Sequence, residues 1–536
     1  EAGAAAARAA GFAAEPAPTP AIEGAGTAEY GAPMAPLWEV PPRRGRGKAF
    51  VDLQNDVTAE DVRLAAREGY RSVEHLKRYT TLGMAPDQGR TGNLNGLAIL
   101  AAATGRGPAE TGATTFRPPA VPVALGPVAG TATGAHVRPV RRTPMHDWHL
   151  GAGAEMLATG LWMRPRVYRR EGESLEQAYV REARHVRDAV GIVDVSTLGK
   201  IDVQGPDAAE FLNRIYANGF AKLPVGKARY GVMLRDDGMV FDDGTTWRLS
   251  EHHFLMTTTT ANAAAVLTHM EYQLAVAWPD LRVHLASVTD QWAAMAVAGP
   301  RSRQVLQACV TDLDLGNDAF PTMAVGAGTL SGMPVMVARL SFSGELAFEV
   351  YAPAHLGRPV WEALIAAGEP QGIMPYGTEA LGTLRIEKGH VSAPELDGRT
   401  TMADLGLGRM ASTKKPYIGS ALMDRPGLTA PDRKVLVGLK ALEGRALRAG
   451  AHLVAALAPP GRGTPEQHKL GPSLGHVTST TYSPATEGYV ALALLAGGRE
   501  RMGETLTAAD PLRWDSQRVE VVAPCFVDPE GSRMHG

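Results

Sequence analysis

A strand, Gly-Pro, helix pattern occurs twice in this chain and limits its possible folds more than any other feature. The two copies are IDVQGPDAAEFLNRI, from Ile201, and MAVAGPRSRQVLQAC, from Met295. Two copies are too few for a solenoid, so the repetition predicts two related α+β subdomains. In the first copy the i, i+3, i+4, i+7 spacing predicts one buried helix face, formed by Ala208, Phe211, Leu212 and Ile215.

The chain before this repeat is expected to contain a linker and a small helical module. Residues 1–47 are rich in Ala and Pro, and their basic run, PPRRGRG, is interpreted as a solvated charge cluster rather than a nucleic-acid site. Residues 48–110 hold three short helical patterns. We expect Thr58 to cap the first helix, and Gly83 and Gly105 to end the other two.

The remaining boundaries follow from changes of pattern. Residues 111–140 are Pro-rich and are expected to be extended. Residues 141–425 should contain the two α+β subdomains, because strands and helices alternate there. Residues 426–536 contain short β-rich runs separated by turn residues, which predict a small barrel or jelly roll: VLVGLKAL, GHVTSTTYS, GYVALALL and RVEVVAP.

Composition excludes several classes of function. Lys plus Arg number 54 against 56 Asp plus Glu, a net charge of −2, which argues against nucleic acid or an anionic membrane as the main partner. Cys309 and Cys525 are the only cysteines, so a disulfide scaffold, an iron–sulfur cluster or a cysteine-built zinc site is not expected. No apolar run is long enough to span a membrane. We therefore expect a cytoplasmic protein with small-molecule or protein partners.

The first residues match no targeting signal. The chain starts without Met, and its opening resembles neither a secretory signal nor a transit peptide. We expect a fragment or a processed chain that follows something upstream.

Familiar catalytic motifs are weak or absent. The segment from Gly406 to Ala411 matches GxGxxA, but no βαβ pattern surrounds it, so a nucleotide site is not expected there. His146 and His149 flank one Asp in MHDWH, and a packing role is favoured over a metal site. No metal site is predicted. No Walker loop occurs.

Two apolar strands contain acidic residues. In YGVMLRDDGMVFDDG the Asp236-Asp237-Gly238 run predicts a hairpin turn. Strict alternation after that turn would place Met239, Phe241 and Asp243 on one face and Val240 and Asp242 on the other. At least one of these carboxylates would then start on a partly apolar surface, where it needs a partner such as a ligand.

The second of these strands lies in the run VARLSFSGELAFEVYAP and contains Glu349. The Ser343-Gly344-Glu345 run predicts a turn. Alternation then places Glu349 with Ala347 and Tyr351 on the face opposite Phe348. From the pattern alone, a solvent-facing acid is slightly favoured over a ligand-binding one.

Six ordered segments resemble the aminomethyltransferase (glycine-cleavage T-protein) family: RRTPMHDWHL, GIVDVSTLGKIDVQGP, YGVMLRDDGMVFDDG, FSGELAFEV, LRIEKG and TTMADLGLGRM. The resemblance covers about residue 141 to the end, and implies a three-domain ring that binds tetrahydrofolate and ends in a β-barrel. Other segments are similar to the alpha subunits of heterotetrameric sarcosine oxidases, among them the run from Lys48 to Gly89, TTFRPP, LWMRP and DPEGSRMHG.

The resemblance carries roles to individual positions. Asp243 falls on the second Asp of the family's DD motif and is implied to be catalytic, and Tyr230 matches an aromatic folate contact. Glu349 matches the acid that binds the pterin ring, while Phe342 stands where a second aromatic of the pocket is Tyr. Leu381 replaces an arginine of the T-proteins. These departures disfavour transfer from a lipoyl-bound aminomethyl group.

The implied activity is that of the folate-dependent half of a sarcosine oxidase. Sarcosine would be oxidised at a flavin (FAD or FMN) on or shared with the beta subunit, and tetrahydrofolate would capture the carbon as methylenetetrahydrofolate, leaving glycine and hydrogen peroxide. Gamma and delta subunits are implied partners, and NAD is implied for a part of the subunit outside this chain. The alternatives are a free aminomethyltransferase, a dimethylglycine or sarcosine dehydrogenase-like folate protein, and a non-catalytic folate-binding scaffold.

The helical module lacks cysteines, which excludes a role in binding an iron–sulfur cluster. A contact with a flavin phosphate is a hypothesis for four of its residues: Lys77, Arg78, Thr80 and Thr81.

Overall fold

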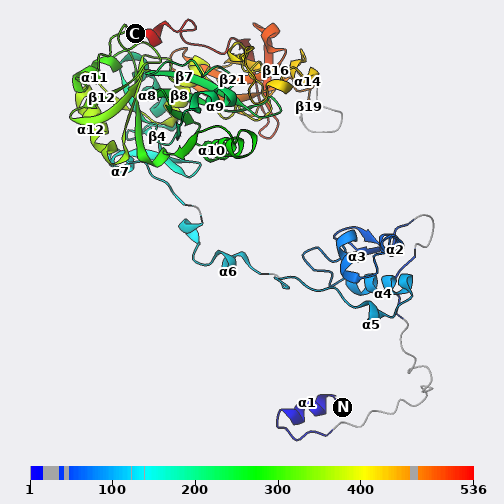
Figure 1. Ribbon diagram of the computed structural model, residues 1–536. Helices are drawn as coiled ribbons and strands as arrows, with labels where there is room; N and C mark the ends of the chain where they lie inside the picture. Colours follow the sequence, from blue (N-terminus) through cyan, green and yellow to red (C-terminus); the bar gives the residue numbers. More distant parts are fainter. Residues whose placement is uncertain (1, 16–35, 42–46, 122, 138, 459–468) are drawn as a thin grey trace. The chain divides into compact units, whose positions relative to one another are not determined.

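The computed structural model describes residues 2–15, 36–41, 47–121, 123–137, 139–458 and 469–536 (Figure 1). The chain divides into two units, residues 1–137 and 138–536. Most of the expected linker, including most of the PPRRGRG run, lies outside the described residues. None of the helices in the described ranges combines the length and the apolar character that crossing a membrane requires.

The first unit is built from short helices around a small apolar core. Its elements are α1 (Ala2–Ala9), β1 (Phe50–Asp52), β2 (Val57–Thr58), α2 (Ala59–Arg67), α3 (Val73–Thr80), α4 (Asn93–Thr104), α5 (Pro108–Thr111), α6 (Leu125–Ala129) and η1 (Gly134–His136). Side chains from β2, α2, α3 and α4 form the core: Val57, Val62, Leu76, Leu97 and Leu100 are all at most 7% exposed. Burial of these faces stabilises helices that are too short to persist alone.

Two of the expected helix boundaries are confirmed. Thr58 caps α2 through a reciprocal capping box with Asp61, and Gly105 ends α4 in the left-handed region. The end of α3 is wrong by two residues, since Thr81 and not Gly83 follows the last helical residue, Thr80. The Thr80 hydroxyl donates to the Leu76 carbonyl and accepts from the NH of Leu82, which competes with further helical bonds.

Two segments expected to lack helices contain them. Residues Ala2–Ala9 form α1 within the expected linker, because alanine has the highest helix propensity. Residues Leu125–Ala129 form α6 within the segment expected to be extended. Pro127 lies in the first turn of α6, where its missing N–H would have no helical partner anyway.

The second unit contains two sheets, and each holds one copy of the repeated pattern. The first sheet has the antiparallel order β10-β6-β9-β8-β7. Its strands are β6 (Gly199–Gln204), β7 (Lys227–Leu234), β8 (Val240–Ser250), β9 (His253–Thr258) and β10 (His284–Ser287), with helices α9 (Ala208–Ile215) and α10 (Ala263–Tyr272), the latter continuing into η2 (Gln273–Ala277). All four residues of the predicted α9 stripe are buried, which confirms that face.

The second sheet has the order β12-β13-β14-β11-β5-β15, in which only the β15–β5 pair is parallel. Its strands are β5 (Gly191–Asp194), β11 (Trp292–Ala298), β12 (Val325–Leu330), β13 (Met333–Ala338), β14 (Ala347–Pro353) and β15 (Met374–Pro375). Around it lie α7 (His146–Gly151), β3 (Ala154–Thr159), β4 (Trp162–Tyr168), α8 (Leu175–Asp188), η3 (Thr289–Gln291), α11 (Ser302–Cys309), η4 (Ala354–Leu356), α12 (Gly357–Gly368), η5 (Glu369–Gln371) and α13 (Thr378–Lys388).

Apolar side chains fill three layers of this unit. Helices α11 and α12 cover one face of the second sheet, and α9 and α10 cover one face of the first. A third cluster contains residues of both sheets, including Ala228, Trp247, Ala338 and Tyr351, together with residues of α8 and α13. The rings of Trp247 and Tyr351 approach to 4.4 Å between centroids, so the inner faces of the two sheets meet there.

The last strands form a closed barrel of order β16-β21-β20-β17-β22-β23, which confirms the expected β-rich end. They are β16 (Lys434–Ala441), β17 (His452–Val454), β20 (Gly475–Ser483), β21 (Gly488–Ala496), β22 (Thr505–Asp510) and β23 (Asp515–Val522). The other elements of this region are η6 (Gly408–Met410), η7 (Ser420–Leu422), α14 (Pro426–Thr429), β18 (Leu457–Ala458), β19 (Lys469–Leu470), η8 (Gly498–Arg501) and α15 (Ser532–His535).

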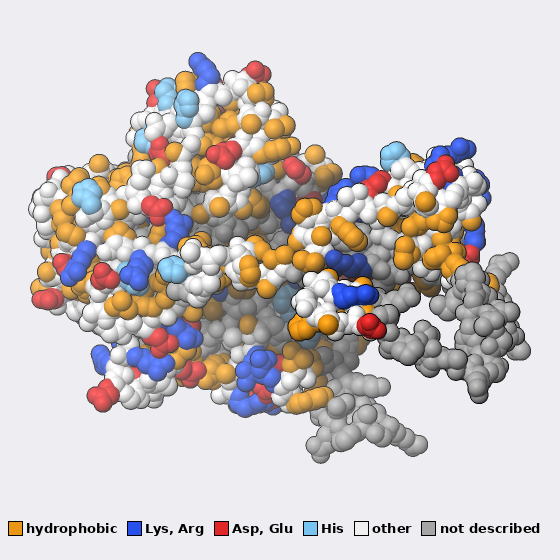
Figure 2. Space-filling model, turned by 90° about the horizontal axis from the view of Figure 1, so that it is seen from below, with side chains coloured by type: hydrophobic (Ala, Val, Ile, Leu, Met, Phe, Trp, Pro, Cys, Tyr) orange, Lys and Arg blue, Asp and Glu red, His pale blue; other side chains and the backbone are white. Residues whose placement is uncertain are grey.

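On the face of the molecule that Figure 2 shows, positively and negatively charged side chains are mixed. Lys and Arg side chains are interspersed with Asp and Glu side chains, and hydrophobic side chains lie between them. This mixture agrees with the net charge of −2.

Candidate functional site

The predicted hairpin turn between β7 and β8 is confirmed. The NH of Gly238 donates to the Arg235 carbonyl over 2.9 Å, and Gly238 has a φ of +84°, a conformation that suits glycine. The Arg235 NH also donates to the Met239 carbonyl over 2.9 Å, which closes the hairpin.

A β-bulge at Phe241 decides which way the two carboxylates of β8 point. Leu234 pairs with Val240 and Met233 pairs with Asp242, so Phe241 has no opposite residue. The strict alternation expected from the sequence is therefore wrong: Val240 shares its face with Asp243, and Phe241 packs against the same core as Met233. The bulge thus places Asp243 on the face of Val240 and Asp242 on the face of Phe241.

Asp242 is a structural acid. Its side chain is fully buried and accepts hydrogen bonds from the Thr259 NH at 3.2 Å, the Thr259 hydroxyl at 2.7 Å and the Asn262 amide at 3.1 Å. These donors precede α10, so Asp242 ties β8 to the start of that helix. Burial raises the pKa of Asp242, and the hydrogen bonds oppose that rise.

Asp243 has a different environment, together with Tyr230. The Tyr230 hydroxyl donates to Asp243 Oδ2 over 2.8 Å, and both side chains keep partial access to solvent. Burial raises the pKa of Asp243 to about 7, the charge of Asp242 adds to this rise, and the Tyr230 hydrogen bond opposes it. A carboxyl group with a pKa near neutrality can both accept and return a proton at physiological pH.

Glu349 lies in β14 on the face that the pattern assigned to it, with Ala347 and Tyr351, whereas Phe348 packs into the opposite core. That face is turned toward the first sheet, so the solvent-facing interpretation is wrong. Glu349 Oε2 accepts from the Tyr351 hydroxyl over 3.1 Å, while Oε1 accepts no hydrogen bond from the described residues. Burial raises the pKa of Glu349, and the charge of Lys200 opposes this rise.

A continuous chain of contacts joins Glu349 to the Asp243 pair. The Tyr351 ring lies against Trp247, whose indole NH donates to the Thr245 hydroxyl over 3.2 Å. Thr245 is paired directly with Tyr230 across the β7–β8 ladder. The two sheets thus bring Asp243, Tyr230 and Glu349 to one inter-sheet face.

This face is accessible although the strands around it are buried. The side chains of Asp243, Tyr230, Thr245 and Glu349 are all partly exposed, while their strand neighbours Asp242 and Val350 are buried. Partly exposed acids among buried apolar neighbours are what a pocket for a polar, planar ligand requires.

Phe342, the fourth predicted contact, lies in the turn between β13 and β14. Its side chain is 42% exposed and stacks on His390 at 5.7 Å between centroids. A hydrogen bond of 3.0 Å joins His390 Nδ1 to the Phe342 carbonyl. Among the described residues, no hydrogen bond or ring contact joins Phe342 to the three residues of the inter-sheet face.

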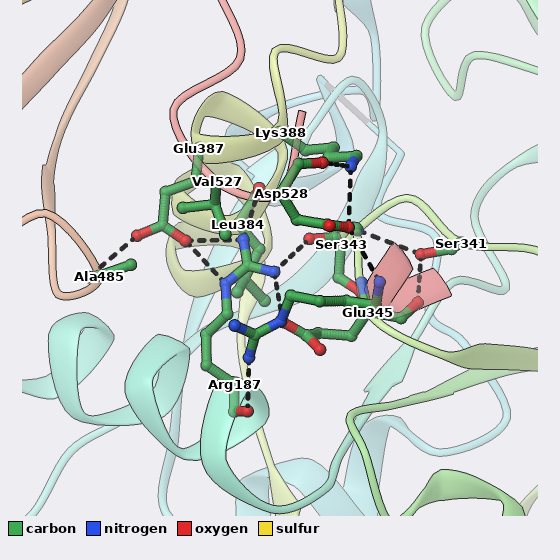
Figure 3. Close-up of polar contacts among 12 residues, drawn as sticks. Arg187, Ser341, Ser343, Glu345, Leu384, Glu387, Lys388, Ala485, Val527 and Asp528 are labelled. Carbon is green, nitrogen blue, oxygen red and sulfur yellow. Dashed lines mark hydrogen bonds and ion pairs between the residues drawn. The ribbon is translucent and has the colours of Figure 1, made fainter. Parts of the chain in front are cut away.

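Arg187 is the important residue that sequence reasoning missed, and Figure 3 shows its guanidinium between Glu345 and Glu387. Nη1 donates to Glu345 at 2.8 Å and to the Ser343 carbonyl at 2.9 Å, and Nε and Nη2 donate to Glu387 at 2.9 and 2.7 Å. Arg187 therefore fixes the turn that carries Phe342 onto α13. The three residues are far apart in the sequence, so no local pattern announces their contact.

Other predicted positions have internal partners. Leu381 packs at the edge of the inter-sheet core. His149 is buried between Asp194, at 3.1 Å, and the Tyr168 hydroxyl, at 2.8 Å, as its packing role predicts. The Gly406–Ala411 segment contains only the short η6 turn.

In the first unit, the four residues considered for a flavin contact also have internal partners. Lys77 is buried and donates to the Thr115 carbonyl over 2.9 Å. Arg78 pairs with Glu74, and the hydroxyls of Thr80 and Thr81 donate to backbone carbonyls.

Three family models match the chain. Residues 145–415 match the GCVT N-terminal domain, residues 434–528 match the glycine cleavage T-protein C-terminal barrel domain, and residues 46–132 match the sarcosine oxidase A3 domain. The first match covers half of the chain and contains the inter-sheet face.

Relatives agree with these matches. The sarcosine oxidase subunit alpha of Rhizobium meliloti (strain 1021) is 49% identical over 94% of this chain and 50% of its own length. The aminomethyltransferase of Streptomyces coelicolor is 32% identical over 72% of this chain and 97% of its own length. This chain thus spans about half the length of the sarcosine oxidase alpha subunit and nearly all of the aminomethyltransferase.

A solved structure shows the same fold. The glycine cleavage system aminomethyltransferase T from Bartonella henselae superposes with a TM-score of 0.61 at 24% identity, over 73% of this chain and 99% of its own. The chain belongs to the glycine cleavage T-protein family, and over almost its whole length it is similar to sarcosine oxidase alpha subunits.

Proposed function

We propose that this chain is the tetrahydrofolate-binding, one-carbon-transferring part of a sarcosine oxidase alpha subunit. The observation that carries this proposal is the inter-sheet face, where Asp243 and Glu349 keep partial solvent access and raised pKa values. The 49% identity to a sarcosine oxidase alpha subunit favours this enzyme over other folate-binding relatives.

The donor and acceptor set fits a pterin. Glu349 Oε1 has no partner among the described residues, so it can accept hydrogen bonds from an amino and N–H edge, which would compensate a buried acid. Trp247 and Tyr351 beside it offer apolar and aromatic surface. Phe342 is proposed as a further aromatic contact, on a turn that Arg187 holds in place.

Each residue of the site has a defined task. Tetrahydrofolate, when bound, supplies the amine nitrogens that receive the one-carbon unit. Asp243 accepts a proton at its carboxylate and can return it, since its pKa is about 7. Tyr230 orients that carboxylate through its 2.8 Å hydrogen bond. Only part of each of these side chains is exposed, and holding both reactants there favours capture of the carbon over hydrolysis.

The remaining parts of the reaction belong outside this chain. We propose that a flavin on or shared with a beta subunit oxidises sarcosine, with glycine, methylenetetrahydrofolate and hydrogen peroxide as the products of the whole enzyme. Gamma and delta subunits, and NAD on the other half of the alpha subunit, complete the proposed assembly. The chain's similarity to only half of a sarcosine oxidase alpha subunit is the basis for this division.

A free aminomethyltransferase is the second candidate, because the match to that enzyme covers 97% of its length. Two observations favour the first proposal. Leu381 stands where the resemblance expects an arginine of the T-protein reaction, and residues 46–132 match a sarcosine oxidase domain.

Calorimetric titration of the purified chain with tetrahydrofolate tests the pterin site. Glu349→Gln should weaken binding by at least about tenfold, because one charge-assisted acceptor is lost. Glu251→Gln, which changes an exposed acid at the β8–β9 turn, should leave binding unchanged. Equal affinity of the Glu349→Gln and wild-type chains would contradict the proposed site.

The catalytic assignment needs the assembled enzyme. Asp243→Asn should abolish folate-dependent product while sarcosine oxidation continues at the flavin. If the variant still forms methylenetetrahydrofolate at the wild-type rate, Asp243 is structural and the chain is a folate-binding scaffold at that position.

A further inference from the structure

A second candidate binding site lies at the outer surface of the C-terminal barrel, where it meets the loop after α13. A cavity of about 430 Å³ is formed there by β16, β17, β20 and residues 397–400. Six charged or titratable side chains line it: Asp397, Arg399, Arg433, Lys434, His452 and His476.

Strand register explains why these side chains converge. His452 pairs directly with His476, and His476 pairs with Leu494 of β21, so the three side chains form one row across the barrel. Leu494 belongs to the apolar cluster outside the barrel, whereas Val477, beside His476, points into its interior. This row of side chains therefore lies on the outer face of the barrel. Along it, apolar Leu494 is followed by the two histidines, His476 and His452, which line the cavity.

The charges of this cavity do not cancel. Arg399 pairs with Asp397 at 2.6 Å, and Arg433 pairs with Asp404, with Nε at 3.0 Å from Oδ1. The Lys434 side chain has no hydrogen-bond or ion-pair partner in the described part of the chain. One full positive charge therefore remains, with two histidines beside it.

The two histidines add hydrogen-bonding groups to the cavity wall. The Ser473 hydroxyl donates to the Gly475 carbonyl, so it accepts from His452 Nδ1–H at 3.0 Å, and His452 Nε2 has no hydrogen-bond partner among the described residues. His476 has no side-chain hydrogen bond among the described residues.

Charged groups around His476 act in opposite directions. Burial lowers the pKa of His476, as do the nearby charges of Lys434, Arg399 and His452, while Asp397 opposes them. A bound anion would favour the protonated imidazole.

We propose that this cavity binds a small molecule bearing two or more anionic oxygens, as carboxylate or phosphate. Uncompensated Lys434 supplies the fixed charge, and imidazole N–H groups can donate further hydrogen bonds. A backbone hydrogen bond connects this cavity to the strand that carries Asp243. The Thr400 carbonyl, at the cavity wall, accepts from the NH of Val240 over 2.9 Å, and Val240 lies three residues before Asp243 of the inter-sheet face.

Two sources of such oxygens are compatible with this position. One is a free phosphate or dicarboxylate. The other is the glutamyl tail of the proposed folate, and this second source alone rests on the proposed function.

The first experiment titrates the purified chain with inorganic phosphate at pH 8, where phosphate is mainly a dianion. Lys434→Ala should weaken binding by about tenfold, because one charge-assisted contact is lost. Lys440→Ala, on the same strand but outside the cavity, serves as the matched control and should bind as the wild type does.

Absence of saturable phosphate binding, or equal affinities of the two lysine variants, would each overturn the proposal. Circular dichroism of Lys434→Ala checks that the barrel is intact, which is expected because Lys434 is exposed.

The second experiment distinguishes the sources by comparing tetrahydrofolate that carries one glutamate with tetrahydrofolate that carries three. If the tail occupies the cavity, the longer ligand binds more tightly and Lys434→Ala removes the difference. If a free anion is the ligand, phosphate binds equally well with and without folate. Glu349→Gln should retain phosphate binding, so failure of the folate site and failure of the anion site are distinguishable.

Discussion

Replacing Asp243 by Asn should stabilise the protein increasingly as the pH rises. Asn keeps an oxygen that can accept from the Tyr230 hydroxyl but carries no charge. In the wild type, the rise of the Asp243 pKa from 3.8 to about 7 means that ionisation costs the folded state about 4 kcal/mol. The variant avoids this cost.

The sign of the pH dependence follows from proton binding. Below pH about 4 Asp243 is protonated in both the folded and the unfolded state, so it makes no difference to stability. Between pH about 4 and about 7 only the folded state keeps the proton, and wild-type stability falls. The advantage of Asp243→Asn should therefore grow by about 3 kcal/mol between pH 5 and pH 8.

Urea unfolding followed by tryptophan fluorescence at pH 5, 6.5 and 8 measures this advantage. All tryptophans except Trp38 lie in the second unit, so the signal reports the unit that contains the site. Glu251→Gln provides an exposed-acid control whose effect should not grow with pH. A constant advantage of Asp243→Asn across this range would mean that Asp243 ionises normally, and would refute the assignment of a neutral-range proton acceptor.

Three further perturbations test the structure around the site. Arg187→Met should destabilise the protein by about 3–5 kcal/mol, because it leaves the buried Glu387 carboxylate without its cation. Adding Glu387→Gln should recover part of that loss of stability, as measured by urea unfolding. If the double variant recovers no stability, the proposed Arg187–Glu387 pairing is contradicted. Gly244→Ala should lower both stability and folate affinity, since its methyl group would lie 2.0 Å from the Thr257 carbonyl oxygen and push β8 from β9; calorimetry and urea unfolding should both register the change. Thr58→Ala should cost about 1 kcal/mol of stability by removing the α2 cap, whereas Thr58→Ser should not, and hydrogen exchange of α2 amides would show the difference.

Local pattern predicted much of the fold because its signals depend on near neighbours. The stripe on α9 is buried as its spacing requires, and the Gly238 turn forms as its residues require. The end of α3 was missed for an equally local reason, a competing hydroxyl on Thr80. Composition predicted the structure of residues Ala2–Ala9 less reliably, because a linker was expected there and a helix is present.

The candidate site was predicted only as a set of residues. Asp243, Tyr230 and Glu349 were named from the resemblance, but their setting was not available from the chain's pattern. The bulge at Phe241 reverses the expected face of Asp243, and bulges have no reliable sequence signal. The environment of Glu349 depends on which sheet faces β14, a contact between strands far apart in sequence.

The sequence by itself determined the repeated strand–helix units, the β-rich end and the acids that stand in apolar strands, because period, turn chemistry and charge are properties of neighbouring residues. Tertiary structure alone decided that Asp242 is enclosed while Asp243 stays accessible, and that Arg187 holds the Phe342 turn onto α13. These outcomes require strands and helices from distant parts of the chain to pair in one register and to bury one particular face, and the resulting low-dielectric surroundings then determine which carboxyl group can exchange a proton.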